Sequence, residues 1–545
     1  MCTGKFSITT SNVANSQARA YEQGINDLLI RARSLVNSFH TTIRTPPEIL
    51  CTISSYFTEE DLFSASQVCR HWRSVLVSSA SLWTRISYNC RPGRAIASFA
   101  RCGSLPIQLL LEPPFPGAFL EGVLLHGNKI VSLTVDHKPF WISQLQSLFT
   151  FSRPSVERLI LHTTEIKERT PDDQGMHEIW QDFPHLRELF VASHPVPIGR
   201  FAAPNLAHLA LESTIRLQEV TAQTILDMLR GCPLLETLLL NYSDTIPSIT
   251  PYGHSPVRLP HLRSIEVGSR EVYSGLITHL DFPLDVVTGF RHMPPVYLCG
   301  QIPLTVLASM QHVLGRIDIR YVTLAAHLWN EYLSIRFEAL HGSLEITTAY
   351  LTDYRWQPTD ILFSPEGVLF SHSPGIENVA EIRIIDCPFD PGKGLDHIGA
   401  AMPNVHTISI RCSTSHGFGL LTSESPAALP FPRLERVMVL GTELGLEVMA
   451  RKRRDLGVPL KTVVIGRDPK GPKDDRLADY RILEELVDDL RVGCPVEIFE
   501  WEIGKEIVGF WSAAGVPESV GLNKNLITLG LMTSTVPFCR TTNQL

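Results

Sequence analysis

The sequence has no pair of cysteines in a C-x-x-C arrangement, and its 11 cysteines are scattered along 545 residues. This pattern argues against a zinc site and against a disulfide framework, so we expect free cysteines, no metal and a reducing compartment. No apolar run reaches the ~18 residues that a membrane helix needs, and the first residues lack the basic start and apolar run of a secretory signal. We therefore expect an intracellular protein, in the cytoplasm, the nucleus or both, with no membrane partner.

An excess of positive charge and a catalytic motif are also absent. The net charge of −8 and the pI near 6.2 argue against a general attraction to nucleic acid. The motifs G-x-S-x-G, H-E-x-x-H and G-x-G-x-x-G do not occur. Residues 466–473 are superficially similar to a phosphate-binding loop, but Pro472 occupies the position of the lysine and Asp474 that of the Ser or Thr. We expect neither enzymatic activity nor a cofactor.

Apolar residues recur at helical spacing in the segment from Thr45 to Ile86. Pro46 and Pro47 suit a first helical turn, where the missing N–H of proline costs nothing, and Thr58 followed by three acidic residues fits the start of a second helix. The apolar stripes comprise Ile49, Leu50, Ile53 and Phe57 in the first helix, and Val68, Cys69, Trp72, Leu76 and Val77 in the third. Three such short helices carry more apolar surface than they can bury among themselves, so we expect a partner to cover part of it.

This segment contains, in order, P-P-E-I-L, Leu62, V-C-R-x-W-R and S-L-W. In the order and spacing of these motifs it resembles the F-box, the adaptor-binding module of SCF-type cullin ubiquitin ligases. Thr45 stands where the family usually has a leucine. The resemblance implies a helix-in-groove contact with the Skp adaptor and, through it, with cullin. The residues that it implies for this contact are Pro47, Ile49, Leu50, Ile53, Leu62, Val68, Cys69, Trp72 and Leu76. The alternative is an ordinary three-helix subdomain with the same stripes.

The segment before the F-box has an apolar stripe of its own. Tyr21, Ile25, Leu28, Leu29 and later apolar residues recur at i, i+4, i+7 and i+8, which predicts a helix over residues 16–39. This stripe must be covered, either by a second chain or partner, or by packing of the helix back on the F-box or the following domain.

Beyond residue 90 the sequence becomes repetitive. Six segments share a proline followed by apolar residues in a fixed layout, and they begin at Phe183, Ala203, Cys232, Leu259, Met402 and Phe431. Where these motifs are adjacent, they follow one another at 20 to 29 residues, the range of leucine-rich repeats. Each motif predicts a short strand with one buried face, and the stretch between motifs returns as a helix, as at residues 221–230 before Gly231.

The motifs resemble the degenerate leucine-rich repeats that commonly follow an F-box, and they predict an α/β fold: an all-α F-box followed by an irregular leucine-rich-repeat-like solenoid. We divide the chain into an N-terminal helix and tail (1–44), the F-box (45–90), the repeat domain (91–520) and a C-terminal tail (521–545). Residues 270–375 give only scattered matches, such as 343–346, so an insertion or distorted repeats occupy that region.

Two segments near the end of the repeat domain carry their own predictions. Residues 477–491 are amphipathic and predict a helix that ends before a strand at 496–499. The basic run at residues 451–454 is either a nuclear-import signal or the cationic end of a helix that Gly457 closes.

Side chains at the variable strand positions point away from the repeat core, so they are candidates for binding a substrate. They are Glu188, Phe190, His208, Glu212, Thr237, Asn241, Glu266, Ser409, Arg411, Arg436 and Met438. The alternative for each of them is a solvated strand position.

Taken with the resemblance, these observations predict a substrate-recognition adaptor of an SCF-type ubiquitin ligase, which binds the Skp adaptor through the F-box and an unidentified substrate protein through the repeats. Two other functions stay open at this point. One is an F-box scaffold that works without cullin, and the other is a small-ligand receptor that uses the concave repeat surface.

Overall fold

The computed structural model describes residues 22–32, 45–88, 92–111, 123, 125–137, 155–163, 183–192, 203–213, 222–242, 256–268, 276–293, 304–327, 332–339, 342–349, 375–385, 399, 401–412, 431–441, 445–466 and 480–494. The chain forms two compact units, Met1–Leu186 and Arg187–Leu545. Each unit is described by itself.

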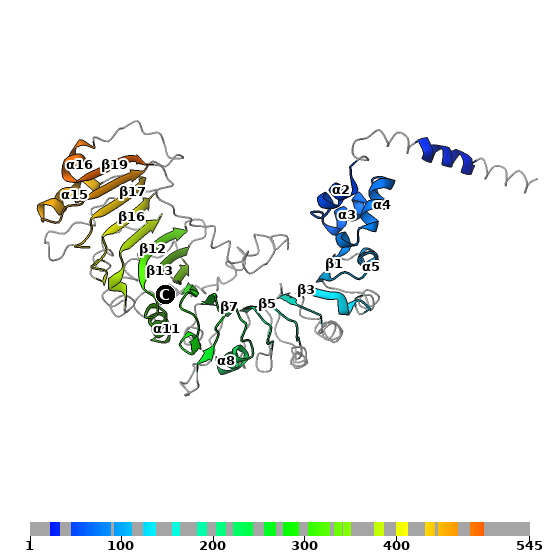
Figure 1. Cartoon of the computed structure of the whole chain (residues 1–545), viewed down its shortest axis with the longest axis horizontal. Coiled ribbons are helices and arrows are strands. Elements are labelled where there is room, and N and C mark those ends of the chain that lie inside the picture. Colours follow the sequence, from blue (N-terminus) through cyan, green and yellow to red (C-terminus); the bar gives the residue numbers. More distant parts are fainter. Residues whose placement is uncertain are drawn as a thin grey trace, which may run out of the picture. The chain divides into compact units, whose positions relative to one another are not determined.

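The first unit contains the predicted helices and the start of a parallel sheet (Figure 1). Its helices are α2 (Pro47–Ser54), α3 (Glu59–Ala65), α4 (Arg70–Ser78) and α5 (Pro92–Arg101), with the 3-10 helices η2 (Ala80–Trp83) and η3 (Gly127–Lys129). The strands β1 (Arg85–Tyr88), β2 (Ile107–Leu111), β3 (Ile130–His137) and β4 (Arg158–Thr163) pair in chain order, and all are parallel. The three helices predicted between Thr45 and Ile86 are confirmed.

Residues 22–32 are helical, in agreement with the helix predicted over 16–39. Their apolar side chains are not covered: Ile25, Leu28 and Leu29 are all at least half exposed. The packing back on the F-box or the next domain, one of the two alternatives, is therefore not seen for this part of the helix.

The second unit is built from strands that alternate with turns and helices. Its elements are β5 (Glu188–Ala192), β6 (His208–Ser213), α8 (Ala222–Arg230), β7 (Thr237–Tyr242), β8 (Val257–Arg258), β9 (Ser264–Gly268), β10 (Leu280–Asp281), β11 (Val287–Met293), α11 (Leu304–Leu314), β12 (Ile319–His327), β13 (Tyr332–Ala339), β14 (Ser343–Ala349), η7 (Ile376–Asn378), β15 (Glu381–Ile385), β16 (Thr407–Cys412), β17 (Arg436–Gly441), α15 (Leu446–Asp455), β18 (Thr462–Gly466), α16 (Arg481–Leu486) and β19 (Asp489–Cys494). The helix predicted at residues 221–230 is thus confirmed as α8.

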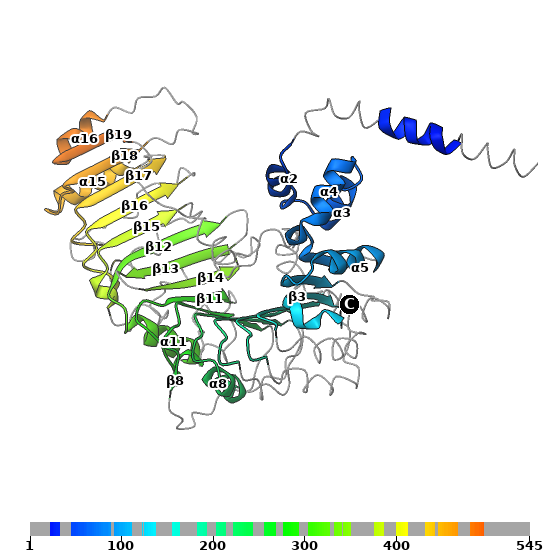
Figure 2. The same cartoon turned by 45° about the vertical axis from the view of Figure 1, so that its right-hand side comes forward.

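Strands of this unit form a long sheet in the order β5-β6-β7-β9-β11-β14-β13-β12-β15-β16-β17-β18-β19. All pairs are parallel except β12 with β13 and β13 with β14. Helices α8, α11 and α15 lie along one side of the sheet, and we call the opposite side its open face (Figure 2). The predicted α/β class with repeating units is confirmed.

All six proline motifs form the same tight turn. The carbonyl of the residue before the proline accepts the N–H of the residue three positions later, with the N···O distance between 3.0 and 3.3 Å in each: Phe183 with Leu186, Ala203 with Leu206, Cys232 with Leu235, Leu259 with Leu262, Met402 with Val405 and Phe431 with Leu434. Proline takes the second position, where its fixed φ fits the turn without strain. The first and fourth residues are at most 2% exposed, so every turn inserts two apolar side chains into the core.

A single carbonyl sets the register between successive repeats. The oxygen of Arg187 accepts the N–H groups of both Ala207 and His208, at 2.8 and 2.9 Å. The same double acceptance recurs at the carbonyls of Ala207, Glu236, Ala380, His406, Glu435 and Lys461. Each of these carbonyls therefore fixes the position of the next strand relative to its neighbour. The fixed register keeps the apolar residues of these strands on the core face.

The region where the sequence repeats fade contains an antiparallel insertion. From β11 the chain passes through α11 to β12, which is separated from β11 in the sheet by β13 and β14. Strand β13 lies between β12 and β14 and is antiparallel to both. Strand β14 then pairs with β11, and β12 pairs with β15, both in parallel. Antiparallel neighbours need no return helix, so the leucine-rich spacing is lost over β12, β13 and β14.

The last predicted helix is wrong in its extent. Residues 481–486 are helical as α16, but Asp489–Cys494 forms the strand β19 beside β18. In this segment Leu490 and Val492 alternate with polar residues, as in a strand. The helical periodicity of the preceding residues extends into the same segment, but the strand is the structure that forms. The strand predicted at 496–499 lies outside the described residues.

The basic run at residues 451–454 belongs to helix α15, and one of its members is inaccessible. Arg453 is 0% exposed and donates from Nη2 to the carbonyl of Phe431 at 3.0 Å. Burial lowers the pKa of this guanidinium to about 10. Gly457, with φ of +78°, follows the helix as predicted. A fully buried arginine that supports the turn of β17 is a structural residue, which favours the helix-end interpretation over an import signal.

We expect Gly342→Ala to destabilise the second unit strongly. Gly342 precedes β14 with φ of +81°, and an added Cβ would lie 2.5 Å from the carbonyl oxygen of Leu284. Gly457 is the matched control, because it has φ of +78° but nothing within 4 Å of an added Cβ. Gly457→Ala should cost about 1 kcal/mol from backbone strain alone, and Gly342→Ala about 1–3 kcal/mol more from the clash. Equal losses in denaturant unfolding would contradict the close approach.

Candidate functional site

Helices α2 and α4 pack against each other and run in the same direction. Near their N-terminal ends, Nε2 of His71 lies 3.2 Å from the carbonyl oxygen of Thr45. Near their C-terminal ends, Sγ of Cys51 lies 3.0 Å from Oγ of Ser79. These two contacts bring Pro46 and Pro47, at the start of α2, close to the residues just before α4.

An apolar surface remains uncovered on this pair of helices. Ile49 is 52% exposed and Ile53 47%, one helical turn apart on α2. Val68, which precedes α4, is 63% exposed, and Pro47 is exposed as well. We call Pro47, Ile49, Ile53 and Val68 the F-box apolar surface. These four residues were implied by the resemblance, and the structure leaves them available to a partner.

Three residues of the same predicted contact are in the interior instead. Leu50 and Leu76 are 0% exposed and Leu62 is 4% exposed, so they form the core of the helical bundle and cannot contact a partner directly. Cys69 and Trp72 are partly exposed. The thiol of Cys69 accepts the N–H of Trp72 at 3.5 Å and so caps the start of α4. Assignment of Leu50, Leu62 and Leu76 to the contact is therefore corrected to internal packing.

Tyr56 is the exposed residue that the sequence did not single out. It follows α2 and is 86% exposed, more than any other large apolar or aromatic residue in the described part of the chain. Its position just after the stripe of α2 was visible in the sequence, but it falls between the helical spacings that identified the others.

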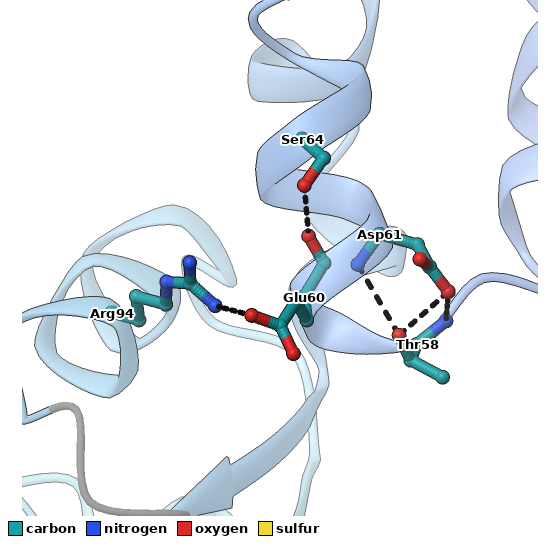
Figure 3. A network of polar contacts seen from close by, with 5 residues as sticks. All are labelled: Thr58, Glu60, Asp61, Ser64 and Arg94. Carbon is teal, nitrogen blue, oxygen red and sulfur yellow. Dashed lines mark hydrogen bonds and ion pairs between the residues drawn. The ribbon is translucent and has the colours of Figure 1, made fainter.

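Helix α3 is fixed by its own first turn (Figure 3). Oγ1 of Thr58 accepts the N–H of Asp61 at 3.2 Å, and the Asp61 carboxylate accepts the N–H of Thr58 at 3.3 Å. This reciprocal pair is a capping box, and it satisfies two N–H groups that the helix cannot bond internally. The predicted N-cap at Thr58 is confirmed.

Glu59 joins the helices to the parallel sheet. Its two carboxylate oxygens accept hydrogen bonds from the N–H of Ser87 in β1, at 2.8 Å, and from the hydroxyl of Ser98 in α5, at 2.7 Å. Burial raises the pKa of the Glu59 carboxyl above its ordinary value, although these hydrogen bonds and the charge of Arg94 work in the opposite direction. Sequence spacing gave no sign of this link, because its three parts lie up to 39 residues apart.

Charged and aromatic groups reinforce the same junction. Nη1 of Arg94 in α5 lies 2.9 Å from the Glu60 carboxylate, as Figure 3 shows. Arg101, also in α5, places its guanidinium 4.3 Å from the ring centre of Trp83, and the Phe63 ring meets Trp83 edge-on at 5.1 Å. The first strand and helix of the sheet are thus attached to α3 and η2 by polar and aromatic contacts on several sides.

The predicted substrate-binding residues lie on the strands of the second unit, with mixed accessibility. Partly exposed are Glu188, Phe190, His208, Glu212, Thr237, Arg411 and Arg436. His208 and Thr237 are neighbours across β6 and β7, with 2.8 Å between Nδ1 and Oγ1. Glu266, Ser409 and Met438 are at most 8% exposed and are therefore corrected to buried positions. The side chain of Asn241 lies outside the described residues.

Comparison with known proteins gives one family match. Residues 46–89 match the model of the F-box-like family. No curated protein matches the chain. The matched range covers α2, α3, α4, η2 and β1, so the F-box-like domain includes the first strand of the parallel sheet.

The sequence also argues against membrane-spanning helices and metal sites. None of the helices in the ranges given above is long and apolar enough to cross a membrane. Within those same ranges, His, Cys, Asp and Glu residues do not gather into a group of three that could hold a metal ion.

We predict that Glu59→Gln changes the pH dependence of unfolding in a defined direction. The raised pKa means that the folded chain holds this proton more tightly than the unfolded chain. Stability from this carboxyl is therefore fully present below its ordinary value of 4.5 and is lost as the pH rises through the raised folded pKa. The amide of the variant does not titrate in this range.

The free energy of unfolding of Glu59→Gln, relative to the unsubstituted chain, should increase as the pH rises through that window. Denaturant unfolding at a series of pH values measures it. Glu48→Gln, which removes an exposed carboxylate of α2, controls for the loss of one negative charge. A difference that stays constant with pH, or that decreases, would contradict the burial of Glu59.

Proposed function

We propose that this protein is a substrate adaptor of an SCF-type ubiquitin ligase, acting inside the cell. Its F-box-like domain docks on the Skp adaptor, and the repeat domain holds a substrate protein. The observation that carries this proposal is the F-box apolar surface: Ile49, Ile53 and Val68 are about half exposed or more on a domain whose core is otherwise well packed.

Physical reasoning supports docking through this surface. Soluble domains keep contiguous apolar patches small unless a partner covers them. Helix α2 presents Ile49 and Ile53, the segment just before α4 presents Val68, and the buried Leu50 and Leu76 belong to the core of the same bundle. A groove on the adaptor that accepts a helical apolar stripe is the complementary partner.

The repeat domain supports the second half of the proposal. We interpret its parallel strands, proline turns and return helices as leucine-rich-repeat-like units. Such arrays present one face of a sheet for binding, because the other face is occupied by the core. Bound substrate would then be held near a recruited ubiquitin-conjugating enzyme, which raises the effective concentration of its lysines at the enzyme.

We expect Ile49→Ser combined with Ile53→Ser to abolish capture of the Skp adaptor. Both side chains are exposed, so the fold should be retained while the apolar contact is lost, and affinity should fall by at least about tenfold. Co-purification of full-length variants with the adaptor measures this. Leu234→Ser is the matched control, because Leu234 is a 44% exposed residue in a turn of the repeat domain. Unchanged adaptor capture by the double variant would overturn the proposed docking surface.

A second measurement distinguishes a ligase subunit from a scaffold without cullin. The unsubstituted chain, purified from cells together with its adaptor, should also carry cullin if it works as a ligase subunit. Adaptor without cullin would show that the chain is an F-box scaffold.

A further inference from the structure

The open face of strands β15, β16 and β17 carries three arginines, Arg383, Arg411 and Arg436. Their place on this face follows from the alternation along each strand, because Ile382, Ile408 and Val437 are 0% exposed on the core face. The register pairs Arg383 with Ser409, and Thr407 with Arg436. Three cations thus share a small area of one sheet face.

Carboxylates near these arginines are already engaged. The Glu381 carboxylate accepts Nε of Arg383 at 3.0 Å and the hydroxyl of Ser409 at 3.3 Å. Glu338 on β13 lies 3.6 Å from the other side of the Arg383 guanidinium. Both acidic groups therefore hold Arg383, and they leave the charge of Arg436 without an ion-pair partner in the described part of the sheet.

Arg436 is a partly buried arginine with an unused donor. Its Nε is buried and has no hydrogen-bond acceptor among the described residues. A buried donor without an acceptor costs free energy, and an anion over the partly exposed remainder of this guanidinium would offset part of that cost by charge attraction. Guanidinium groups bind carboxylates in a bidentate manner, which makes a carboxylate the fitting acceptor.

We propose that this surface, Arg383, Arg411 and Arg436, binds an acidic segment of the substrate protein. The proposal rests on the substrate-adaptor function and adds the chemical class of the segment that is recognised. Three strands span about 10 Å across the sheet, and Arg436 and Arg411 differ by four register positions, or about 13 Å along the strands. An extended peptide of about four to six residues covers this area.

The side chains around the three arginines favour a short acidic peptide over a nucleic acid. The ring centre of Tyr321 lies 4.7 Å from the guanidinium carbon of Arg383, so this ring, Glu381 and Glu338 together hold the Arg383 side chain in place. Farther along the open face, β5 and β6 carry Glu188 and Glu212, and the whole chain has a net charge of −8. A long nucleic acid would be repelled there, whereas a short acidic peptide segment meets only the arginines and the two carboxylates, Glu381 and Glu338, whose charge Arg383 already offsets.

Fluorescence anisotropy with a fluorescein-labelled decaglutamate peptide and the full-length chain tests the proposal. We expect binding at low ionic strength that weakens as salt is added, since the contact is charged and partly exposed. Arg436→Gln should weaken it by at least about tenfold, the loss of one charge-assisted hydrogen-bonded pair. Arg433→Gln is the matched control, because Arg433 is an exposed arginine in the turn before the same strand, and it should change the affinity by less than about twofold.

Four results would overturn the proposal. They are the absence of decaglutamate binding at low ionic strength, equal affinities of Arg436→Gln and Arg433→Gln, tighter binding of decalysine, and tighter binding of a 20-nucleotide oligothymidylate. If thermal unfolding shows that the Arg436→Gln variant is not folded, Arg411→Gln replaces it, and the same loss of decaglutamate affinity is expected.

Adaptor capture by the same preparations separates this proposal from the docking function. If the unsubstituted chain captures the adaptor but does not bind decaglutamate, the acidic-segment proposal fails and the adaptor function stands. If it binds decaglutamate in an Arg436-dependent manner but captures no adaptor, the adaptor function fails and the arginine surface stands as a binding site of another kind.

Discussion

The repeated proline turn is the constraint on which the second unit depends. At each turn the residues before and two after the proline are buried, and after five of the six turns the carbonyl that follows accepts two N–H groups of the next strand. One short motif thus fills the core, ends the return segment and fixes the register of its neighbour. Because the register is unbroken from β5 to β9 and from β15 to β17, the side chains of the open face fall into rows there, and those rows make a shared binding surface possible.

Size imposes a different constraint on the F-box-like domain. A bundle of helices of seven to nine residues cannot bury all of its apolar side chains, since its surface is large relative to its volume. Leu50, Leu62 and Leu76 take the few interior positions, while Ile49 and Ile53 remain outside. Glu59 attaches this bundle to β1 and α5 through two hydrogen bonds, and the exposed apolar side chains are left for a partner.

The sequence was informative where one local motif is sufficient and less so where distant groups meet. The short strands of the six proline motifs, helix α8 and the cap at Thr58 each depend on neighbours in sequence, and all were predicted correctly. Helical periodicity placed Leu50 and Ile49 on one stripe but could not say which edge of that stripe faces the core. The links from Glu59 to Ser87 and Ser98, and the extent of β19, depend on contacts that periodicity does not encode. Leu50, Leu62 and Leu76 of the expected contact set are interior, and the docking role of the other members stays a prediction.

Charged side chains cluster on the open face beside the irregular part of the repeat array. The antiparallel strands β12 and β13 interrupt the parallel order and contribute Tyr321 and Glu338 to the open face, beside Arg383 of β15. Strand β12 is itself parallel to β15 and follows helix α11, but its other neighbour in the sheet is the antiparallel strand β13. The sequence of β12 and β13 is free of the leucine spacing, so their outward positions can carry charged and aromatic residues. Departures from local rules commonly mark functional sites, and here the departure supplies the groups that orient Arg383.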